Sequence, residues 1–357
     1  MRITVLIVAV ASLLSVMAAA QPSAPAQDAG AAPAVDAGAA ASYKIAKRLA
    51  VGGAGGWDYV AFDAGSRRLY VAHDDRVEVL DAISGKVIGQ VMKTEGVHGV
   101  AIAGEPGRGF ASNGRAGTVS AFDLETLKVI REIPVGKKPD AIVYDPFTRR
   151  VFVFNGKSAD ATVIDAAGMK AAGTIPLGGA PEFAVADGRG RVFVNVEDTG
   201  ELVAIDAKAM KVAARWPLKP CAEPTGLALD AAHRRLFSVC RNRLMAVTDA
   251  DTGAQVATVP IGAVADGCVF DPDAGLAISS NGEGTLTVVK EESPSVFTVK
   301  ATVPTQRGAR TIALDPATHA LYLPTAELGA APPPTAENPK PRPPVLPGTF
   351  VILQMER

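Results

Sequence analysis

Side chains able to carry a charge return along this sequence at a regular interval. The interval is 40 to 44 residues, and six of the seven positions that it separates hold such a side chain: Asp58, His98, Asp140, Glu182, Asp266 and Arg310, with Thr225 at the remaining position. Carboxylates are hard oxygen ligands and imidazole is a softer one, so these residues together could bind a divalent metal ion, a cationic ligand or a polar small molecule. The alternative is that they are solvated or paired with one another. No cofactor motif accompanies them, and none of the spacings is that of a His-Glu-x-x-His zinc site.

Two further candidate binding residues lie in loops. His73 stands in the segment HDDR and Arg241 in the segment RNR, each directly after a short apolar run. We expect both residues on the same face as the seven recurring residues. His73 is expected to be a solvated loop residue, and the alternative is that it takes part in the binding site. The Asn-Gly pairs at 113–114 and 281–282 predict tight turns with positive φ. His233 and His319 fall in turns of the opposite face, where we expect them to be solvated.

The regular interval comes from an internal repeat. One series of anchors consists of Asp63, Asp145, Asp187, Asp230, Asp271 and Asp315, with Ala103 in the one place that lacks an Asp. A second series, with spacings of 41 to 43 residues, consists of Asp81, Asp123, Asp165, Asp206 and Asp249. Two series with one period indicate a repeated structural unit.

Each unit holds four short β-like runs separated by turn residues. In the third unit the runs are AIVYD, RVFVFN, ATVID and AAGTIPL. Four antiparallel strands in about 42 residues are typical of one blade of a β-propeller, and seven units predict seven blades. A helical repeat would need apolar residues at a period of 3.6, which is absent. The expected fold class is therefore all-β, a seven-bladed β-propeller with four antiparallel strands per blade.

The two ends of the repeat region predict how the ring closes. The last unit ends at its third strand, in the segment GTFVILQMER, and so lacks a fourth. Residues 44–52, KIAKRLAVG, align without gaps to residues 128–136, KVIREIPVG, which form the fourth strand of the second unit. We therefore expect the N-terminal strand to pair with the C-terminal blade, which would remove the exposed sheet edges that a two-domain split would leave.

Short segments within the repeat carry a family resemblance. They are LYVAHDD (69–75), VFVFNGK (151–157), VFVNVED (192–198) and LYLPTAE (321–327), together with DPATHALYLP (315–324) and PGTFVIL (347–353). Over residues 42–357 the chain resembles the YncE-like, YVTN-family seven-bladed β-propellers, and more distantly the propeller subunits of quinoprotein amine dehydrogenases. The resemblance implies the propeller fold and export from the cytoplasm. It supplies no catalytic or cofactor-binding residue, since the family's members mostly have no assigned chemistry.

The N-terminus has the features of a secretory signal peptide. Arg2 precedes an apolar stretch from Ile3 to Met17, and Ala18-Ala19-Ala20 offers a cleavage site. We therefore expect residues 1–20 to be a signal peptide and the protein to be periplasmic or secreted. After cleavage we expect no membrane span; the alternative is that the segment stays uncleaved as a membrane anchor. Residues 21–41 are rich in Ala and Pro and predict a disordered tether.

Cysteines and one long insertion complete the structural expectations. Cys221 and Cys240 bracket two neighbouring antiparallel strands and predict a disulfide, whereas Cys268 is expected to be a buried small apolar residue. Residues 328–347 form a Pro-rich insertion between the second and third strands of blade seven. It is either a lid or partner-docking strap over the face of the seven recurring residues, or a tolerated surface insertion.

These features favour a binding function over catalysis. We expect an exported, monomeric propeller. It would use the mouth of its central channel, on the face that carries the seven recurring residues, to bind a small polar ligand, an ion or a partner protein. The alternatives are a metal-assisted hydrolase, lactonase or lyase at the same place, with a divalent metal ion as cofactor, and a propeller subunit that docks a redox partner. Nucleic acid is disfavoured as a partner because the chain has a net charge of −1.

Overall fold

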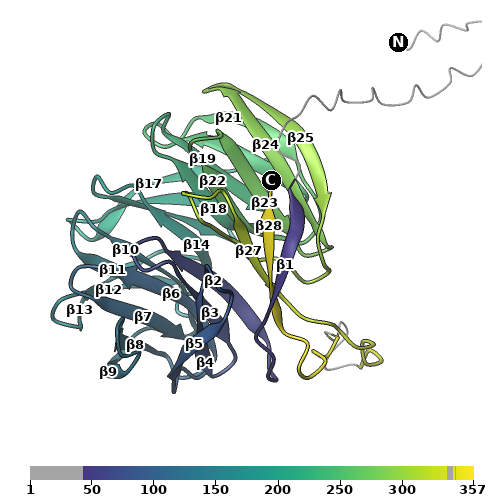
Figure 1. Ribbon diagram of the computed structural model, residues 1–357. Coiled ribbons are helices and arrows are strands. Elements are labelled where there is room, and N and C mark those ends of the chain that lie inside the picture. The colour runs from purple at the N-terminus through teal and green to yellow at the C-terminus, as the bar shows by residue number, and fades with distance from the viewer. Residues whose placement is uncertain (1–42, 336–340, 342) are drawn as a thin grey trace, which may run out of the picture. The chain divides into compact units, whose positions relative to one another are not determined.

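The protein forms a ring of seven β-sheets. The computed structural model describes residues 43–335, 341 and 343–357, so the predicted signal peptide and tether lie outside the described residues. Every sheet has four antiparallel strands, and the described chain contains no helix (Figure 1). The prediction of an all-β, seven-bladed β-propeller is confirmed. In this part of the chain there is accordingly no helix long and apolar enough to cross a membrane.

The first six blades follow the chain without interruption. Blades one to three consist of β2 (Trp57–Asp63), β3 (Arg68–His73), β4 (Arg76–Asp81) and β5 (Val87–Met92); β6 (Val97–Ala103), β7 (Arg108–Asn113), β8 (Thr118–Asp123) and β9 (Val129–Pro134); and β10 (Pro139–Asp145), β11 (Arg150–Asn155), β12 (Asp160–Asp165) and β13 (Lys170–Pro176). Blades four to six consist of β14 (Pro181–Ala186), β15 (Arg191–Val196), β16 (Glu201–Asp206) and β17 (Lys211–Pro217); β18 (Pro224–Asp230), β19 (Arg235–Cys240), β20 (Leu244–Asp249) and β21 (Gln255–Pro260); and β22 (Ala265–Asp271), β23 (Leu276–Asn281), β24 (Thr285–Ser293) and β25 (Val296–Pro304).

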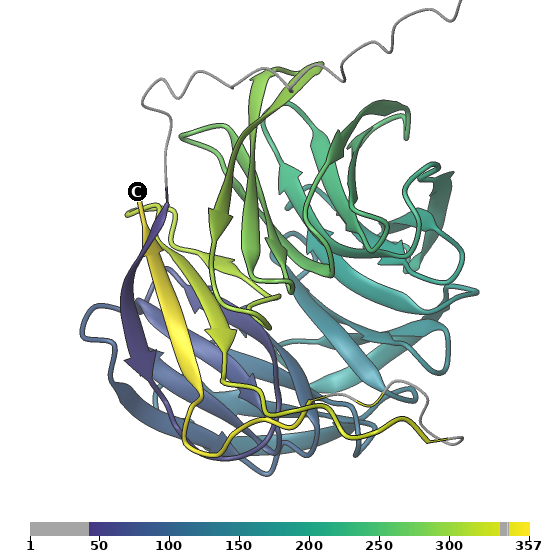
Figure 2. The ribbon, with the colours of Figure 1, turned by 90° about the vertical axis from the view of Figure 1, so that its right-hand side faces the viewer.

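The seventh blade is assembled from both ends of the chain. Its strands are β26 (Ala313–Leu314), β27 (Leu321–Thr325), β28 (Val351–Glu356) and, outermost, β1 (Lys44–Ala50). Strand β1 pairs antiparallel with β28 from Lys44 opposite Glu356 to Ala50 opposite Val351, and Figure 2 shows the two strands side by side in purple and yellow. The predicted closure of the ring by the N-terminal strand is confirmed.

The recurring Asp residues are turn residues. Asp63 accepts hydrogen bonds from the backbone N–H of Gly65 and from the Ser66 hydroxyl, and Asp81 accepts one from the backbone N–H of Ser84. The other members of the two series cap the equivalent turns in the same way. A short side chain that bonds to the backbone two or three residues ahead stabilises a turn, which explains why the repeat places Asp at the ends of its first and third strands.

Buried side chains join each blade to the next. Phe110 of blade two shares one buried cluster with Val151 and Val153 of blade three, and Leu69 of blade one shares another with Tyr322 of blade seven. The first strands of neighbouring blades contact one another around the central channel. Because no blade buries its faces alone, closure of the ring is a condition for the stability of every unit.

Candidate functional site

The seven recurring residues occupy one structural position, and we call them the ring residues. Six are the second residue of a first strand, and Arg310 takes the seventh place just before β26. In each of these six strands the first residue pairs with the second strand, as Trp57 does with His73, and a register shift follows. A β-bulge redirects the side chains around it, so the same irregularity in each blade places the ring residues in a common environment at one end of the channel, the channel mouth.

One part of the ring is a cluster of two carboxylates around an imidazole. His98 Nδ1 lies 2.5 Å from Asp58 Oδ2 and 3.6 Å from Asp140 Oδ1. On the far side of Asp140, Lys138 Nζ lies 3.4 Å from Oδ2. One donor atom each from Asp58, His98 and Asp140 lie within 4.8 Å of one another, a separation that would let them share a metal ion.

Arg310 links this cluster to the next carboxylate. Its Nε donates to Asp266 Oδ2 at 2.8 Å, while Nη2 donates to Asp58 Oδ1 at 3.2 Å and to the backbone carbonyl of Trp57 at 3.0 Å. The guanidinium also lies over the Trp57 ring, 5.9 Å from its centre. A chain of ion pairs therefore runs around the mouth from Asp266 to Asp140.

Glu182 stands apart from this chain. A long hydrogen bond of 3.5 Å runs from the Tyr59 hydroxyl to its Oε2, and no ion pair is found for it among the described residues. Burial, followed by the charge of Asp140 and by a hydrogen bond with and the charge of Glu197, raises the pKa of Glu182 to about 9. A carboxyl group with such a pKa is protonated at neutral pH.

Two further acids of the mouth, Asp266 and Asp140, also resist ionisation. Burial raises the pKa of Asp266 to about 6, although Arg310 acts in the opposite direction, and burial likewise raises the pKa of Asp140. For His98, burial lowers the pKa, but Asp58 and Asp140 outweigh it and the net shift is upward. For the three acids burial is the largest cause, and the negative charge of a neighbouring carboxylate acts in the same direction.

Two of the predicted residues, Arg241 and Thr225, do not join the chain of ion pairs around the channel mouth. Arg241 Nε donates to Glu197 Oε1 at 2.7 Å, and Arg241 acts on Glu182 and Asp266 through its charge alone. Thr225 is buried, and its hydroxyl donates to the carbonyl oxygen of Ala265 at 2.9 Å. Arg241 therefore belongs to the rim, and Thr225 is a strut between blades five and six.

The prediction that His73 is solvated is wrong. Strand β3 continues through His73, which is fully buried, and its ring lies 4.4 Å from that of Phe350. Its Nδ1 lies 3.0 Å from Arg76 Nη2 and 3.3 Å from Glu78 Oε1, and no side-chain hydrogen bond or ion pair with a ring residue is found for it in the described part of the chain. The loop tip that reaches solvent is Asp74-Asp75, one residue later than the sequence suggests.

Two expectations about loops also need correction. His233 and His319 are not simply solvated, because each pairs with a carboxylate: His319 with Asp271 at 2.9 Å, and His233 with Asp230 at 2.7 Å.

The Asn-Gly pairs do not form positive-φ turns. The positive φ falls later, at Gly117 and Gly284, because these loops are longer than two residues. The Asn side chains instead donate to hydroxyls of the third strand, as Asn113 does to Ser120 at 2.7 Å.

Tyr59, Lys138 and Glu197 are members of the mouth that the sequence analysis did not name. The signal for Tyr59 lies in the position after each ring residue, which is Gly, Ala or Thr in five blades but aromatic at Tyr59 and Phe183. These two rings meet edge to face at 5.2 Å and line a small cavity of about 80 Å³ beneath the charged groups. The mouth is therefore a polar rim above an apolar floor.

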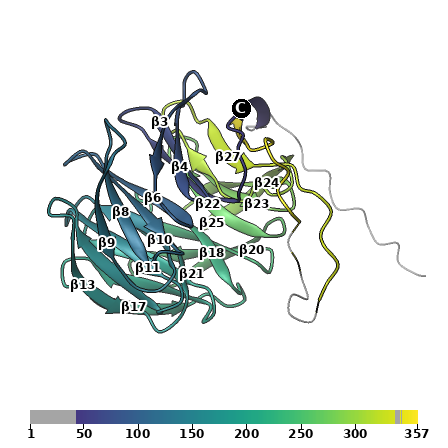
Figure 3. The same cartoon turned by 90° about the horizontal axis from the view of Figure 1, so that it is seen from below.

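The blade-seven insertion is fixed to the outer part of its blade. Within the insertion, Gly329 N–H donates to the Pro344 carbonyl at 2.8 Å. Leu346 N–H donates to the carbonyl of Glu327, just before the insertion, and Gly348 N–H, just after it, donates to the carbonyl of Gly53, which follows β1, both at 2.9 Å. Figure 3 shows this connection projecting beyond the strands. A groove of about 770 Å³ beside it is lined by Arg48, Gln306, Arg307, Ala326, Glu327, Leu328, Leu346, Gly348, Thr349 and Val351. No contact with a ring residue is found for the described part of the insertion, and a lid or strap stays a prediction.

The cysteines have the expected arrangement. Cys221 and Cys240 form a disulfide, with Cα atoms 5.7 Å apart, that joins the segment before β18 to the end of β19. Cys268, in β22, is free and buried, and burial raises the pKa of its thiol above the range in which thiols ionise. A nucleophilic role for Cys268 is therefore disfavoured.

Comparisons with known proteins support the fold. No family model matches the chain, and no curated protein matches it. Among solved structures, one titled Kuenenia stuttgartiensis Hydrazine Synthase is 16% identical with a TM-score of 0.68 over 76% of this chain and 92% of that chain. A chain of a structure titled Crystal Structure of Mitotic Checkpoint Complex is 16% identical with a TM-score of 0.68 over 94% and 99%. A structure titled Structure of U3-55K is 9% identical with a TM-score of 0.71 over 87% and 98%. At these identities the likeness shows the β-propeller fold alone.

Proposed function

We propose that this protein is an exported binding protein whose channel mouth captures a small cationic ligand of the protonated-amine class. One observation carries the proposal: Glu182 is an acid with no cationic partner among the described residues, in a mouth where its neighbours Asp140 and Glu197 are also acidic. The other carboxylates of the ring already share His98, Lys138 or Arg310. A ligand cation would supply the positive charge that the mouth lacks.

The proton on Glu182 gives this binding a distinct signature. With a pKa of about 9, Glu182 is neutral before the ligand arrives at neutral pH. A cation beside it favours the carboxylate, so binding would release a proton. The ion-paired groups Asp58, Arg310 and Asp266 would hold the shape of the rim, while Tyr59 and Phe183 would offer an apolar surface to the hydrocarbon part of the ligand.

Export is supported by two independent features. The N-terminal sequence has the charge, apolar stretch and small residues of a signal peptide. A disulfide such as Cys221–Cys240 is typical of proteins in an oxidising compartment, for example the periplasm or the exterior of the cell.

A metal-assisted reaction is the second candidate, and one observation favours it. Asp58, His98 and Asp140 could hold a divalent metal ion, with Arg310 nearby to stabilise an anion.

The channel mouth could instead bind a partner protein, which is a second version of the binding proposal. It is supported by the likeness to a chain of the mitotic checkpoint complex, whose title describes an assembly.

Calorimetry tests the leading proposal. The mature protein would be titrated with a panel of primary, secondary and quaternary amines, and with divalent metal ions, in two buffers of different ionisation enthalpy. We expect an amine to bind with a heat that differs between the buffers, because a proton is released. Glu182→Gln should abolish that difference, whereas Glu125→Gln, at an exposed turn on the opposite face, should retain it. Binding of metal ions alone would favour the second candidate, and no binding by any compound would refute the small-ligand proposal.

A further inference from the structure

Blade six departs from the repeat at Glu291. In blades one to five the residue directly after the third strand donates its backbone N–H to the turn between the first and second strands, and these residues are Ala82, Leu124, Ala166, Ala207 and Ala250. Glu291 occupies the same place, since its N–H donates to the carbonyl of Gly275 at 2.9 Å. An apolar position has thus become a carboxylate whose side chain is only 3% exposed.

Blade five departs from the repeat at His233. The equivalent turn residue in three other blades is Ser66, Thr148 or Thr318, and each hydroxyl donates to the Asp of its own turn at 2.6 Å. His233 replaces this hydroxyl, with Nδ1 2.7 Å from Asp230 Oδ2. An imidazole has thus taken the place of a simple capping group.

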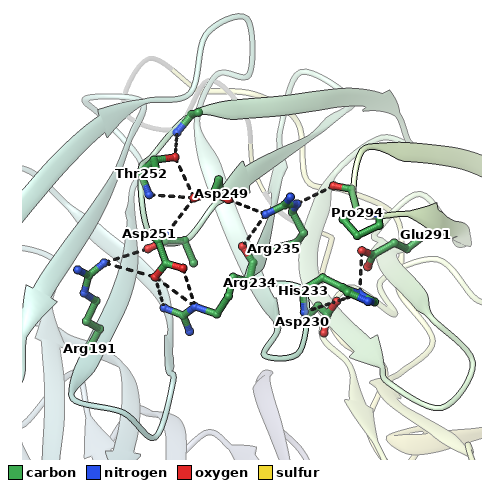
Figure 4. Close-up of polar contacts among 12 residues, drawn as sticks. Arg191, Asp230, His233, Arg234, Arg235, Asp249, Asp251, Thr252, Glu291 and Pro294 are labelled. Atoms are coloured by element: carbon green, nitrogen blue, oxygen red, sulfur yellow. Dashed lines mark hydrogen bonds and ion pairs between the residues drawn. The ribbon is translucent and has the colours of Figure 1, made fainter.

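The two departures meet across the interface between blades five and six. His233 Nδ1 lies 3.1 Å from Glu291 Oε1, and one donor atom each from Asp230, His233 and Glu291 lie within 4.8 Å of one another (Figure 4). Because Nδ1 carries one hydrogen at most, it can satisfy only one of the two carboxylates. Neither oxygen of Glu291 has a hydrogen-bond partner within the described chain.

Arg235 forms no ion pair with either carboxylate among the described residues. Its Nη1 donates to Asp249 at 2.6 Å and its Nε donates to the Pro294 carbonyl at 2.7 Å (Figure 4), so it acts on Glu291 through its charge alone. Two carboxylates, each with a side chain only 3% exposed, therefore share one imidazole, and no lysine or arginine ion pair is found for either of them within the described chain. Two buried carboxylates this close repel one another, and a cation between them would offset the cost of burying both charges.

We propose that Asp230, His233 and Glu291 form a binding site for a divalent transition metal ion such as Zn²⁺. A nitrogen ligand with two carboxylates suits this class of ion better than Ca²⁺ or Mg²⁺, which prefer all-oxygen sites. His233 is 52% exposed, so the solvent side leaves room for water as a further ligand. Asp230 is already oriented by the backbone N–H of Ala232, which donates to Oδ1 at 2.9 Å.

The ligands come from two blades, which gives the ion a structural role. Asp230 and His233 belong to the turn between β18 and β19, and Glu291 belongs to β24. A metal ion here would bind the folded ring and not the unfolded chain, and so would stabilise the contact between blades five and six. The site lies at the opposite end of the blades from the ring residues and is independent of the ligand proposed for the channel mouth.

The repeat itself supplies the test variants. Glu291→Ala and His233→Thr restore the residue types that other blades carry at these places, and His319→Thr is a matched control because His319 pairs with one carboxylate, Asp271. The full-length protein would be stripped with EDTA, dialysed and loaded with ZnCl2, MnCl2 or CaCl2. Bound metal would be measured after gel filtration, and Tm would be measured with and without each ion.

We expect the wild-type protein and His319→Thr to retain Zn²⁺ and to gain about 5 °C or more in Tm at metal concentrations well above Kd. Glu291→Ala and His233→Thr should lose the retained metal and this gain. In EDTA, Glu291→Ala should melt at or above the wild-type temperature, because the variant removes one of two buried carboxylates that share a single imidazole. The proposal is overturned if no ion is retained by the wild-type protein, or if both variants retain metal and gain Tm as the wild type does. In the second case the metal would be held at the channel mouth or elsewhere.

Discussion

His98 Nδ1 lies 2.5 Å from Asp58 Oδ2, although the two residues are 40 positions apart and belong to neighbouring blades. Asp58 also accepts a hydrogen bond from Arg310 of blade seven at 3.2 Å. A single carboxylate of blade one therefore joins the blades on either side of it. This arrangement exists only in the closed ring, because β1 and the ends of the chain must first complete blade seven.

Asp58→Asn should lower the pKa of His98. Burial alone disfavours the imidazolium, and Asp58 is the main group that favours it. The titration can be followed by NMR of the imidazole ring protons, with His73, His233 and His319 as internal references in the same spectra. An unchanged His98 titration in the variant would show that the short contact with Asp58 does not control this histidine.

Arg310→Ala should destabilise the protein at neutral pH by about 2–3 kcal/mol, because it leaves Asp58 and Asp266 without their shared cation. The loss should shrink as the pH falls towards 6 and below, because Asp266, whose pKa of about 6 is held down by Arg310, takes up a proton more readily in the variant. Urea unfolding at pH 7.5 and pH 5 measures both effects. Arg115→Ala is the matched control: its pair with Asp74 is exposed and should contribute less than about 1 kcal/mol at either pH. Equal losses for the two variants would contradict the prediction.

Glu182→Gln should flatten the pH dependence of stability on the alkaline side. A carboxyl group with a folded pKa of about 9 and an ordinary pKa of 4.5 holds its proton more tightly in the folded state. Its contribution is therefore complete at low pH and is lost as pH rises from the ordinary value through about 9. Between pH 6.5 and 9, above the range of Asp266, we expect the wild-type protein to lose stability on the order of 1 kcal/mol more than the variant.

Urea unfolding at several pH values across this window would measure that difference, with Glu125→Gln expected to follow the wild type. Parallel curves for the wild type and Glu182→Gln would mean that Glu182 is ionised in the folded protein. The proton release invoked for ligand binding would then have no source.

Replacing both Cys221 and Cys240 by Ala should destabilise the protein by about 3 kcal/mol, because the disulfide closes a loop with a sequence separation of 19 residues. Cys268→Ala should cost less, since it removes one buried sulfur and no cross-link. Urea midpoints under non-reducing conditions, and again with dithiothreitol, test this. If dithiothreitol left the wild-type midpoint unchanged, the cross-link would be absent or without effect on stability.

Comparison of one blade with the next could have revealed more of the site than it did. Aligning the seven units shows Glu291 where blades one to five have Ala or Leu, and His233 where three blades have Ser or Thr. Those departures were visible in the residues, but their meeting was not. His233 and Glu291 are 58 positions apart, which is neither the length of one repeat nor the length of a turn. Because the hairpin of β24 and β25 is longer than in other blades, it is also hard to see from the sequence that Glu291 corresponds to the residue after the third strand of those blades. The burial of His73 had no sequence signal, because it depends on Phe350 from the other end of the chain.

The sequence by itself determined the number of blades, the four strands of each, the closure of the ring and the seven equivalent positions at the channel mouth. These features follow from turn residues and strand periodicity, and the same pattern recurs in every copy of the repeat. Only the tertiary structure decided which ring residues pair, that Glu182 has no cationic partner among the described residues, that Thr225 is a strut, and that Asp230, His233 and Glu291 converge. Those relations depend on distances of a few ångström between side chains from different blades. The repeat period fixes which blades are neighbours, but rotamers, bulges and burial fix those distances.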